Sequence, residues 1–407
     1  MFKATQKKGH QDGVALITAL IITSIAVSLA TMIMYRQQIQ IRLSSNISHL
    51  EQAYLYANGM EDWAATILER SFKDHKDYVS HDDDWYSDTA LILPIEGGLM
   101  TGKLIDLQSR INMNLLNIPP PAKTTNNQNT PNSTNNQGDG TNNQAGGTNN
   151  ENNNPKIQPD YAKITRNRLI RLVEDIDEDR DLDSADGFVD ILKDWIDKDD
   201  INGNLLEKGD GSGYGAETSY YQSLDPAYYS ANTELVSPTE LRLLKNMKEK
   251  IYQELIKYVA TLPNKRSNKD NPVPINVNTA SAEVLRAIGF AKDTIERIQE
   301  ARKDNPFIDI KDFIRRYAPN AIGSENNTNA NNNSGNNNPN LNSPNNNTNE
   351  LNVQNLGVNS NYFLLTGTVE INNARLFVNS ILERNNEQVS VIMRDLSNPN
   401  TITKVKK

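Results

Sequence analysis

The sequence of 407 residues contains no cysteine and only four histidines. The missing thiols exclude disulfide bonds, a zinc–thiolate centre and a cysteine nucleophile. His10, His49, His75 and His81 lack the spacing of a metal-binding motif, and no serine–histidine–aspartate order or pair of acids in an apolar setting can be recognised. The sequence therefore predicts a protein that is not an enzyme, and a membrane-tethered hydrolase has no residues to support it.

Positive charge is also in deficit, because 42 Lys and Arg face 51 Asp and Glu, for a formal net charge of −9. General nucleic-acid binding needs clustered positive charge to meet phosphates, so the charge balance is unfavourable for that function.

Hydrophobic content is low at 37%, and two asparagine-rich tracts, 119–156 and 323–355, explain much of that value. Such segments bury too little apolar surface to offset their chain entropy, so both are predicted to be disordered linkers.

In contrast, residues 14–34 (VALITALIITSIAVSLATMIM) form an uninterrupted run without a charge. As a helix that rises ~1.5 Å per residue, this run spans the roughly 30 Å hydrocarbon layer of a membrane. Lys3, Lys7 and Lys8 precede it, which favours a cytoplasmic N-terminus and places the rest of the chain outside. We therefore predict a single transmembrane helix at 14–34.

The helical pattern continues beyond the apolar run. Apolar residues recur at spacings near three and four, which is typical of an amphipathic helix that needs a partner surface. This stripe comprises Leu43, Ile47, Leu50, Tyr54, Ala57, Trp63 and Ile67. One long helix is therefore predicted to begin in the membrane and to end packed on a soluble domain.

The rest of the chain predicts an α+β fold with a large, mainly helical insertion. A β-like stretch at 99–116 lies within residues 35–118, and three antiparallel strands are predicted near 361–395, within 356–407. Asn372-Asn373 and Asn385-Asn386 supply turns that tolerate positive φ. Residues 157–322 lie between these parts. Helical spacing is found there at 165–176, 186–197, 237–262, 279–288 and 291–303.

Acidic residues gather in this helical block. DWIDKDD contains Asp194, Asp197, Asp199 and Asp200, and Glu217 follows in GAETSYY. Hard oxygen ligands on a helix end and its loop suit Ca²⁺. Asp197, Asp199, Asp200 and Glu217 are therefore candidate calcium ligands, and a solvated acidic loop without a metal is the alternative.

A second acidic run imitates an EF-hand loop. Asp179, Asp181 and Asp183 alternate, and Asp190 stands at the twelfth position. Ser184 occupies the sixth place, where an EF-hand has glycine, and the last ligand is shortened from Glu to Asp. This run is the weaker metal candidate.

The leader KKGHQDG followed by VALITAL resembles the start of a pilin precursor. Together with RQQIQIRLSSN, EQAYLYANGMEDWA, DWIDKDD, INVNTASAEVL and NYFLLTGTVEI in this order, it resembles the K-type minor pseudopilins of type II secretion systems. The resemblance implies a leader at 1–13, removed by a prepilin peptidase between Gly13 and Val14, and methylation. Thr18 then stands at the fifth mature position, where most pilin-like proteins carry Glu. In having a neutral residue at this position, the chain resembles the K-type subgroup.

The resemblance also implies a pilin-like frame, with a long helix and an antiparallel sheet, into which the helical domain is inserted. It implies a single-pass anchor in the bacterial inner membrane, a periplasmic C-terminal domain, and calcium in the inserted domain with Asn276 and Asn278 close by. The expected partners are the I- and J-type minor pseudopilins, the major pseudopilin, the prepilin peptidase and the inner-membrane assembly platform. The expected role is to cap the pseudopilus tip and to prime its assembly for protein export.

A DNA-binding minor pilin of a DNA-uptake system is the alternative. Residues 275–313 resemble a helix-hairpin-helix unit, in which the backbone NH groups of a glycine-rich hairpin meet a phosphate. The hairpin here reads Ile288-Gly289-Phe290-Ala291, so a second glycine is missing, and the basic residues around it are balanced by acids. We therefore expect this unit to be structural and no nucleic acid to bind.

Overall fold

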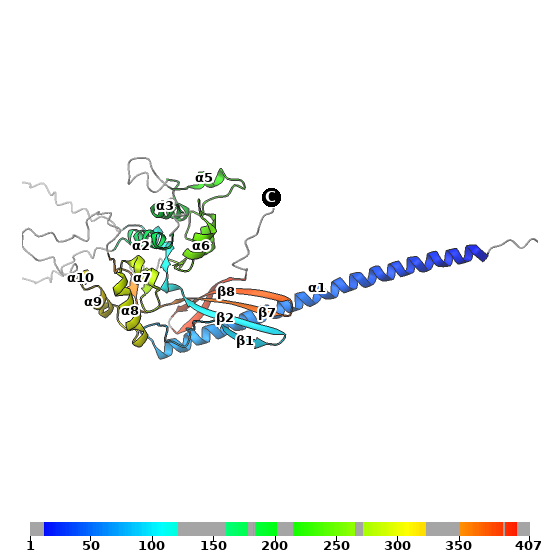
Figure 1. The fold of residues 1–407 in the computed structure, drawn as a ribbon, viewed down its shortest axis with the longest axis horizontal. Coiled ribbons are helices and arrows are strands. Elements are labelled where there is room, and N and C mark those ends of the chain that lie inside the picture. The colour runs from blue at the N-terminus through cyan, green and yellow to red at the C-terminus, as the bar shows by residue number, and fades with distance from the viewer. Residues whose placement is uncertain are drawn as a thin grey trace, which may run out of the picture.

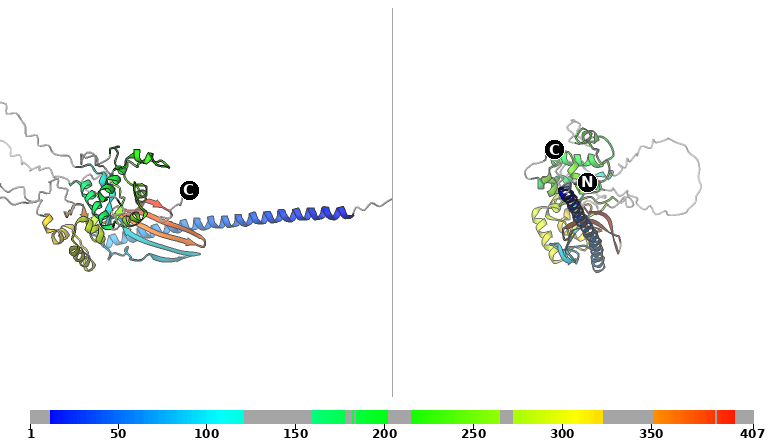
Figure 2. Two further views of the ribbon diagram at one scale, coloured as in Figure 1. Left: turned by 45° about the horizontal axis from the view of Figure 1, so that its top comes forward. Right: turned by 90° about the vertical axis from the view of Figure 1, so that its right-hand side faces the viewer.

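The computed structural model describes residues 12–120, 159–177, 182, 184–201, 215–264, 272–322, 351–385 and 387–396. Helix α1 (Asp12–Asp74) runs through 63 residues, or about 95 Å at the α-helical rise. Its first half projects away from the rest of the chain, and its second half lies along the folded part (Figures 1 and 2). The prediction of one long helix is confirmed. The two asparagine-rich linkers lie largely outside the described residues.

A five-stranded antiparallel sheet packs against the second half of α1, in the order β1-β2-β7-β8-β9. Its strands are β1 (Leu91–Ile95), β2 (Gly98–Asp106), β7 (Tyr362–Ile371), β8 (Ala374–Asn385) and β9 (Gln388–Asp395). Strand β2 pairs with β7 along its whole length, with Gly98 opposite Ile371 and Asp106 opposite Phe363. The sheet is therefore completed across the helical region, and the predicted α+β fold is confirmed.

The three predicted C-terminal strands are present, and Asn372 adopts the positive φ of 50° that its turn requires. Strand β1, a short run that contains Pro94, was not predicted. The stretch 99–116 was predicted as a strand or as a strand followed by a turn, and the second alternative is confirmed, because β2 ends at Asp106. The remainder forms the 3₁₀ turns η1 (Leu107–Ser109) and η2 (Met113–Asn117) around the short strand β3 (Ile111–Asn112).

Small residues let α1 lie close to the sheet. Its buried face carries Ala53, Ala57, Met60, Ala64 and Leu68 at helical spacing. Gly102 and Gly367 are paired on neighbouring strands beneath Met60. A Cβ atom on Gly367 would lie 2.9 Å from Met60 Sδ and 2.3 Å from the Thr101 carbonyl oxygen, so only glycine fits this position.

The helical region contains most of the other elements. They are α2 (Tyr161–Ile176), α3 (Ala185–Ile196), α5 (Thr218–Gln222), η3 (Pro238–Leu243), α6 (Glu249–Leu255), β4 (Val259–Ala260), β5 (Ile275–Asn276), α7 (Ala282–Ile288), α8 (Lys292–Asp304), α9 (Ile310–Tyr317), α10 (Pro319–Ile322) and β6 (Leu356–Gly357). Buried Leu172, Leu192, Trp195 and Leu285 belong to its core, and Ile111 from β3 packs in the same cluster.

One predicted helix is wrong in length. The pattern over 237–262 predicted continuous helical spacing, but the chain forms η3, a bend, α6 and strand β4. Asn246 has φ +61°, which an α-helix cannot accommodate, and β4 pairs in parallel with β3. The predicted start at Ser237-Pro238 is correct, since Ser237 and Glu240 form a capping box.

A buried carboxylate joins the sheet to the helical region. Asp106, at the end of β2, is 3% exposed. It accepts hydrogen bonds from Thr279 Oγ1 at 2.5 Å, Ser360 Oγ at 2.7 Å, Gln108 N at 2.8 Å and Asn276 Nδ2 at 3.3 Å. These donors come from three separate parts of the chain. Four satisfied contacts in a buried place fix the helical region against the sheet.

Candidate functional site

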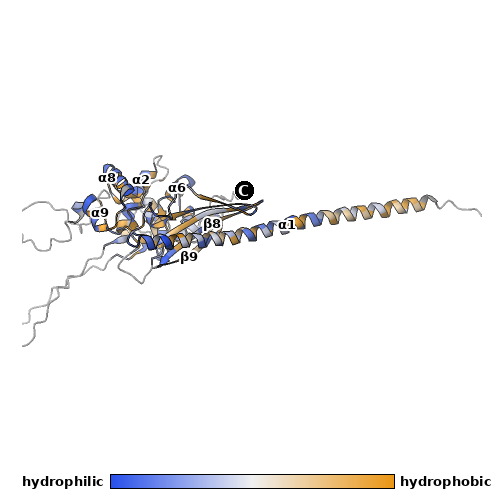
Figure 3. Cartoon of the chain, turned by 90° about the horizontal axis from the view of Figure 1, so that it is seen from below, coloured by the Kyte–Doolittle hydropathy of each residue, from blue (hydrophilic) through white to orange (hydrophobic). Residues whose placement is uncertain are grey.

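The first half of α1 has the character of a membrane anchor. An 18-residue window in it has a mean hydropathy of 2.3 and none of it is buried against the protein. Figure 3 shows this end of the helix as mostly orange with pale segments and almost no blue, whereas the end beside the sheet alternates between blue and orange. It is the single helix among the described residues that is long and apolar enough to cross a membrane.

The predicted cleavage site and Thr18 both lie at the start of this helix. Gly13 and Val14 fall in its first turn. The Thr18 hydroxyl donates to the carbonyl oxygens of Val14 and Ala15, each at 3.0 Å. Its polar group is thereby satisfied within the helix, as an apolar surrounding requires. Cleavage after Gly13 stays a prediction.

The predicted apolar stripe of α1 divides into two parts. Ala57 is buried on the sheet, and Trp63 and Ile67 pack beside it. Leu43, Ile47, Leu50 and Tyr54, which precede them, are exposed by 58%, 49%, 48% and 41%. Four large apolar side chains on one side of a helix outside the membrane run form a surface that another helix can cover. We call this surface the exposed stripe.

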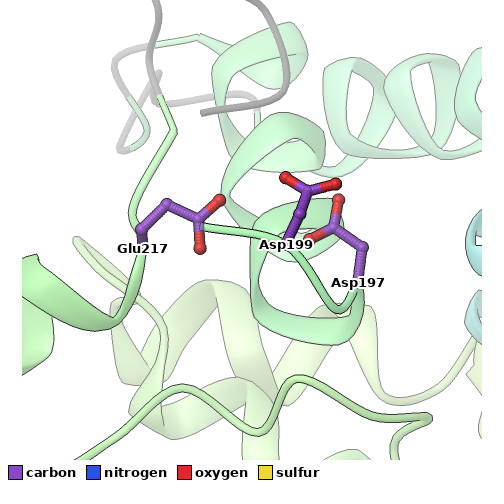
Figure 4. Close-up of side chains that lie close together, drawn as sticks. All are labelled: Asp197, Asp199 and Glu217. Carbon is purple, nitrogen blue, oxygen red and sulfur yellow. The ribbon is translucent and has the colours of Figure 1, made fainter. Parts of the chain in front are cut away.

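Three of the predicted metal ligands meet in space. Asp197, Asp199 and Glu217 each place a carboxylate oxygen within 4.8 Å of the others, and Figure 4 shows the three side chains converging. Asp197 follows the last residue of α3, and Glu217 precedes the first residue of α5. We call this group the acidic centre.

Several carboxylate oxygens of the acidic centre lack a hydrogen-bond donor in the described part of the chain. Asp197 Oδ1 and both carboxylate oxygens of Glu217 are buried without a hydrogen-bond partner among the described residues. Burial, reinforced by the charges of Asp199 and Asp194, raises the pKa of Asp197 to about 7. Burial and the charges of Asp194 and Asp197 raise the pKa of Glu217 to about 8. Asp197 also sits at the negative end of the α3 dipole. A bound cation would relieve all of these costs.

A further acid, Asp194, positions the centre. It is fully buried and its Oδ2 accepts a hydrogen bond from the Ala216 backbone N–H at 2.9 Å. This bond holds the chain just before Glu217 against α3. Its place in DWIDKDD was the only signal in the sequence. Asp200, which was also predicted as a ligand, is exposed and lies outside the group.

Among the described residues, the other predicted metal ligands, Asp190, Asn276 and Asn278, lie outside the acidic centre. Asp179, Asp181 and Asp183 of the EF-hand-like run lie outside the described residues, and Asp190 forms a salt bridge with Arg166 at 2.7 Å. Asn276 and Asn278 were expected near the metal, but their amides form other hydrogen bonds. Asn276 Nδ2 donates to Val79 O and Ser360 Oγ, beside the buried Asp106, and Asn278 Nδ2 donates to Phe307 O.

The helix-hairpin-helix resemblance is reflected in geometry. Helix α7 ends at Ile288 and is capped by Gly289, whose φ is +113°, and α8 begins at Lys292. Several basic side chains near the hairpin are paired: Lys303 lies 3.3 Å from Glu300, and Arg315 and Arg316 both contact Asp312. Paired cations offer little to a phosphate backbone, and the absence of nucleic-acid binding stays a prediction.

An apolar helix that projects freely and then packs on an antiparallel sheet is the arrangement of a structural subunit of the pilin type, and the helix is long and apolar enough to cross a membrane. Residues 109–264 and 275–332 match two family models described as type II secretion system (T2SS), protein K. The chain belongs to the type II secretion system protein K family, whose members are structural pseudopilins and not enzymes.

Similar proteins support the assignment. The chain is 31% identical over 275 residues to type II secretion system protein K of Aeromonas hydrophila, covering 67% of this chain and 69% of that protein. It is 29% identical over 314 residues to the Pseudomonas aeruginosa protein, covering 75% and 76%. It also resembles a chain in the crystal structure of the GspK-GspI-GspJ complex from enterotoxigenic Escherichia coli, with a TM-score of 0.57 over 87% of this chain and 99% of that chain. At 21% identity, this last likeness shows the fold.

Proposed function

We propose that this chain is a minor pseudopilin that caps the tip of a periplasmic pseudopilus and primes its assembly for protein export. The observation that carries the proposal is the shape of the molecule. The apolar half of α1 projects from one end, and the bulky helical region lies at the opposite end (Figure 1). A subunit of this shape can join a helical bundle from below but leaves no room for another subunit above it.

The partners we propose are I- and J-type minor pseudopilins, by analogy with the complex that the similar Escherichia coli chain forms according to its title. The major pseudopilin and the inner-membrane assembly platform would lie below them. The exposed stripe offers an apolar surface for a partner helix. The anchor would lie in the bacterial inner membrane, with the sheet and helical region in the periplasm.

We further propose that a prepilin peptidase cuts between Gly13 and Val14 and that methylation follows. Thr18, at the fifth mature position, supports the tip location, because a first subunit has no neighbour above it whose amine needs an acid. The domain division also stays a proposal. It assigns 14–34 to the membrane, 35–118 and 356–407 to the pilin-like frame and 157–322 to the inserted domain.

We propose that the acidic centre binds Ca²⁺ through Asp197, Asp199 and Glu217. Three carboxylates match the preference of Ca²⁺ for oxygen ligands, and the buried unpaired oxygens support a missing cation. When bound, the ion would neutralise the acids and link the end of α3 to the start of α5. Ala216 and Asp194 already hold these two elements together.

Co-purification of the full chain with I- and J-type minor pseudopilins in detergent tests the proposal. Replacing Leu43 and Ile47 by Glu should reduce recovery of the partners about tenfold or more, because charges would be buried against a partner helix. Leu55→Glu is the matched control. Leu55 is 69% exposed and lies on another side of α1, since each residue turns the helix by about 100°.

The control should recover the partners as well as the wild type does. Equal recovery with all variants would contradict the role of the exposed stripe. No recovery with the wild type would contradict the proposed function itself.

A further inference from the structure

A polar cleft lies between the segment that follows α1 and helix α8. It has a volume of about 310 Å³, which is at the lower end for ligand-binding pockets, roughly 300–1,000 Å³. Its walls come from parts of the chain that are about 200 residues apart in sequence. The lining residues are His81, Asp82, Asn278, Gln299, Arg302 and Lys303.

Arg302 supplies a fixed positive charge to this cleft. Its Nη1 donates to the carbonyl oxygens of Val277 at 3.0 Å and Ala280 at 2.7 Å. No carboxylate forms a salt bridge with Arg302 within the part of the chain that the structure describes. Burial lowers the pKa of Arg302 to about 10, so the guanidinium remains charged at neutral pH. Its Nε and Nη2 form no hydrogen bond to the residues that the structure describes.

The opposite wall carries an acid that does not neutralise Arg302. Asp82 is exposed, and its carboxylate has no hydrogen-bond or salt-bridge partner among the residues described. Gln299 on α8 is partly buried and likewise has no side-chain hydrogen bond to any described residue. The cleft therefore presents a guanidinium, a carboxylate and an amide whose hydrogen-bonding capacity is largely unused.

The remaining wall is an uncharged aromatic surface. The ring of His81 stacks on Tyr86 with centroids 3.9 Å apart. Burial, together with the charge of Arg302, lowers the pKa of His81 to about 4, so this imidazole is neutral in the periplasmic pH range. Lys303, at the edge, is exposed and lies 3.3 Å from Glu300. Among the charged residues that line the cleft, Arg302 is the partly buried cation, whereas Asp82 and Lys303 are exposed.

We propose that this cleft binds an extended polypeptide segment that carries an acidic side chain, with the carboxylate on Arg302. Guanidinium groups bind carboxylates in a forked geometry. Asp82 can then accept a hydrogen bond from a backbone N–H of the same segment, and Gln299 can donate one to a backbone carbonyl. A simple inorganic anion would make no use of these two groups. The proposal rests on the proposed function, because the cleft lies beside the end of α1 that is opposite to the membrane anchor, where a tip subunit would meet other polypeptides.

Calorimetric titration of the detergent-solubilised full chain tests the inference. The probe is an acetylated and amidated pentapeptide of glycine with two glutamates, and the same peptide with two glutamines is its neutral counterpart. The acidic peptide should bind about tenfold tighter or better. Arg302→Met should abolish this preference, and Asp82→Asn should tighten binding of the acidic peptide, because it removes a like charge from the cleft.

Arg297→Met is the matched control, since Arg297 is exposed on the same helix and outside the cleft. It should leave the preference unchanged. Arg302→Met removes two bonds to backbone carbonyls, so its melting temperature is measured alongside, and Asp82→Asn gives an independent result if folding is affected. Equal binding of the two peptides, an equal loss in Arg297→Met, or no gain in Asp82→Asn would overturn the inference.

Co-purification with the I- and J-type proteins separates the two proposals. Wild type and Arg302→Met should both recover these partners. Failure of peptide binding with intact recovery overturns the cleft alone, whereas failure of recovery by the wild type overturns the proposed function. Loss of recovery in Arg302→Met alone would show that the cleft is part of the subunit interface and is not a free binding site.

Discussion

Buried carboxylate oxygens in two parts of this molecule have opposite surroundings. Asp106, at the joint between the sheet and the helical region, accepts four hydrogen bonds. In the acidic centre, Asp197 Oδ1 and both Glu217 oxygens accept none from the described residues. Burial raises the pKa in both places. Hydrogen bonds partly oppose the shift at Asp106, whereas neighbouring acids add to it at Glu217.

The difference separates a structural role from a binding role. A buried carboxylate with enough donors is complete and holds together the elements that supply them. Buried carboxylate oxygens without donors are costly by themselves, and a bound cation would offset that cost. The joint is therefore expected to depend on its own residues, and the acidic centre on calcium.

The largest effect should come from Asp106→Ala. The change leaves the hydroxyls of Thr279 and Ser360 and the N–H of Gln108 buried without their acceptor. We expect a loss of about 3 to 5 kcal/mol in the free energy of unfolding, measured by chemical denaturation of the full chain in detergent. Asp77→Ala is the control, because Asp77 is exposed. A loss below about 1 kcal/mol would show that the joint does not depend on this carboxylate.

Glu217→Gln should have the next largest effect, and it should appear only with calcium. In the wild type, a free Ca²⁺ concentration a hundred times Kd would stabilise the folded chain by about 2.7 kcal/mol. Glu217→Gln should remove most of that gain while leaving the metal-free chain as stable as before or more stable. Melting curves in EDTA and in millimolar Ca²⁺ measure both.

Asp200→Asn is the matched control for the calcium response. Asp200 belongs to the same acidic segment but lies outside the group of three. It should keep the wild-type response to Ca²⁺. A wild-type melting temperature that does not differ between EDTA and Ca²⁺ would contradict the metal site.

The pH dependence should be smaller. The folded-state pKa values of Asp197, about 7, and Glu217, about 8, lie above the unfolded values of ~4. The metal-free folded state therefore binds more protons than the unfolded state, and its stability must fall as pH rises. We expect the melting temperature in EDTA to decrease by a few degrees between about pH 5 and pH 8, where the two acids are still protonated in the folded state and ionised in the unfolded state. The double variant Asp197→Asn, Glu217→Gln should flatten this slope, and a slope that rises in EDTA would contradict the assignment.

Much of the fold could be predicted because its signals are local. The uncharged run at 14–34 and the helical spacing after it predicted α1, and alternation with asparagine turns predicted β7, β8 and β9. Non-local pairing could not be predicted. Strands β3 and β4 have two residues each, too few for a period, and Asn246 breaks a helical pattern through its backbone conformation alone.

The candidate sites show the same limit. Asp197, Asp199 and Glu217 could be proposed as calcium ligands from the sequence, because carboxylate ligands can be recognised from the residue type alone. The exclusion of Asp200 and the positioning role of Asp194 depend on which side of the α3 end each carboxylate faces. Asp106, Thr279 and Ser360 carry no shared motif, and only the pairing of β2 with β7 and of β5 with β6 brings them together.

The most direct test of the tip assignment is to locate this chain in assembled pseudopili. Gold labelling of a C-terminal tag, viewed by electron microscopy, would report its position in filaments formed with the I- and J-type and major pseudopilins. The account predicts one label at a single end of each filament. Labels distributed along the shaft would contradict it.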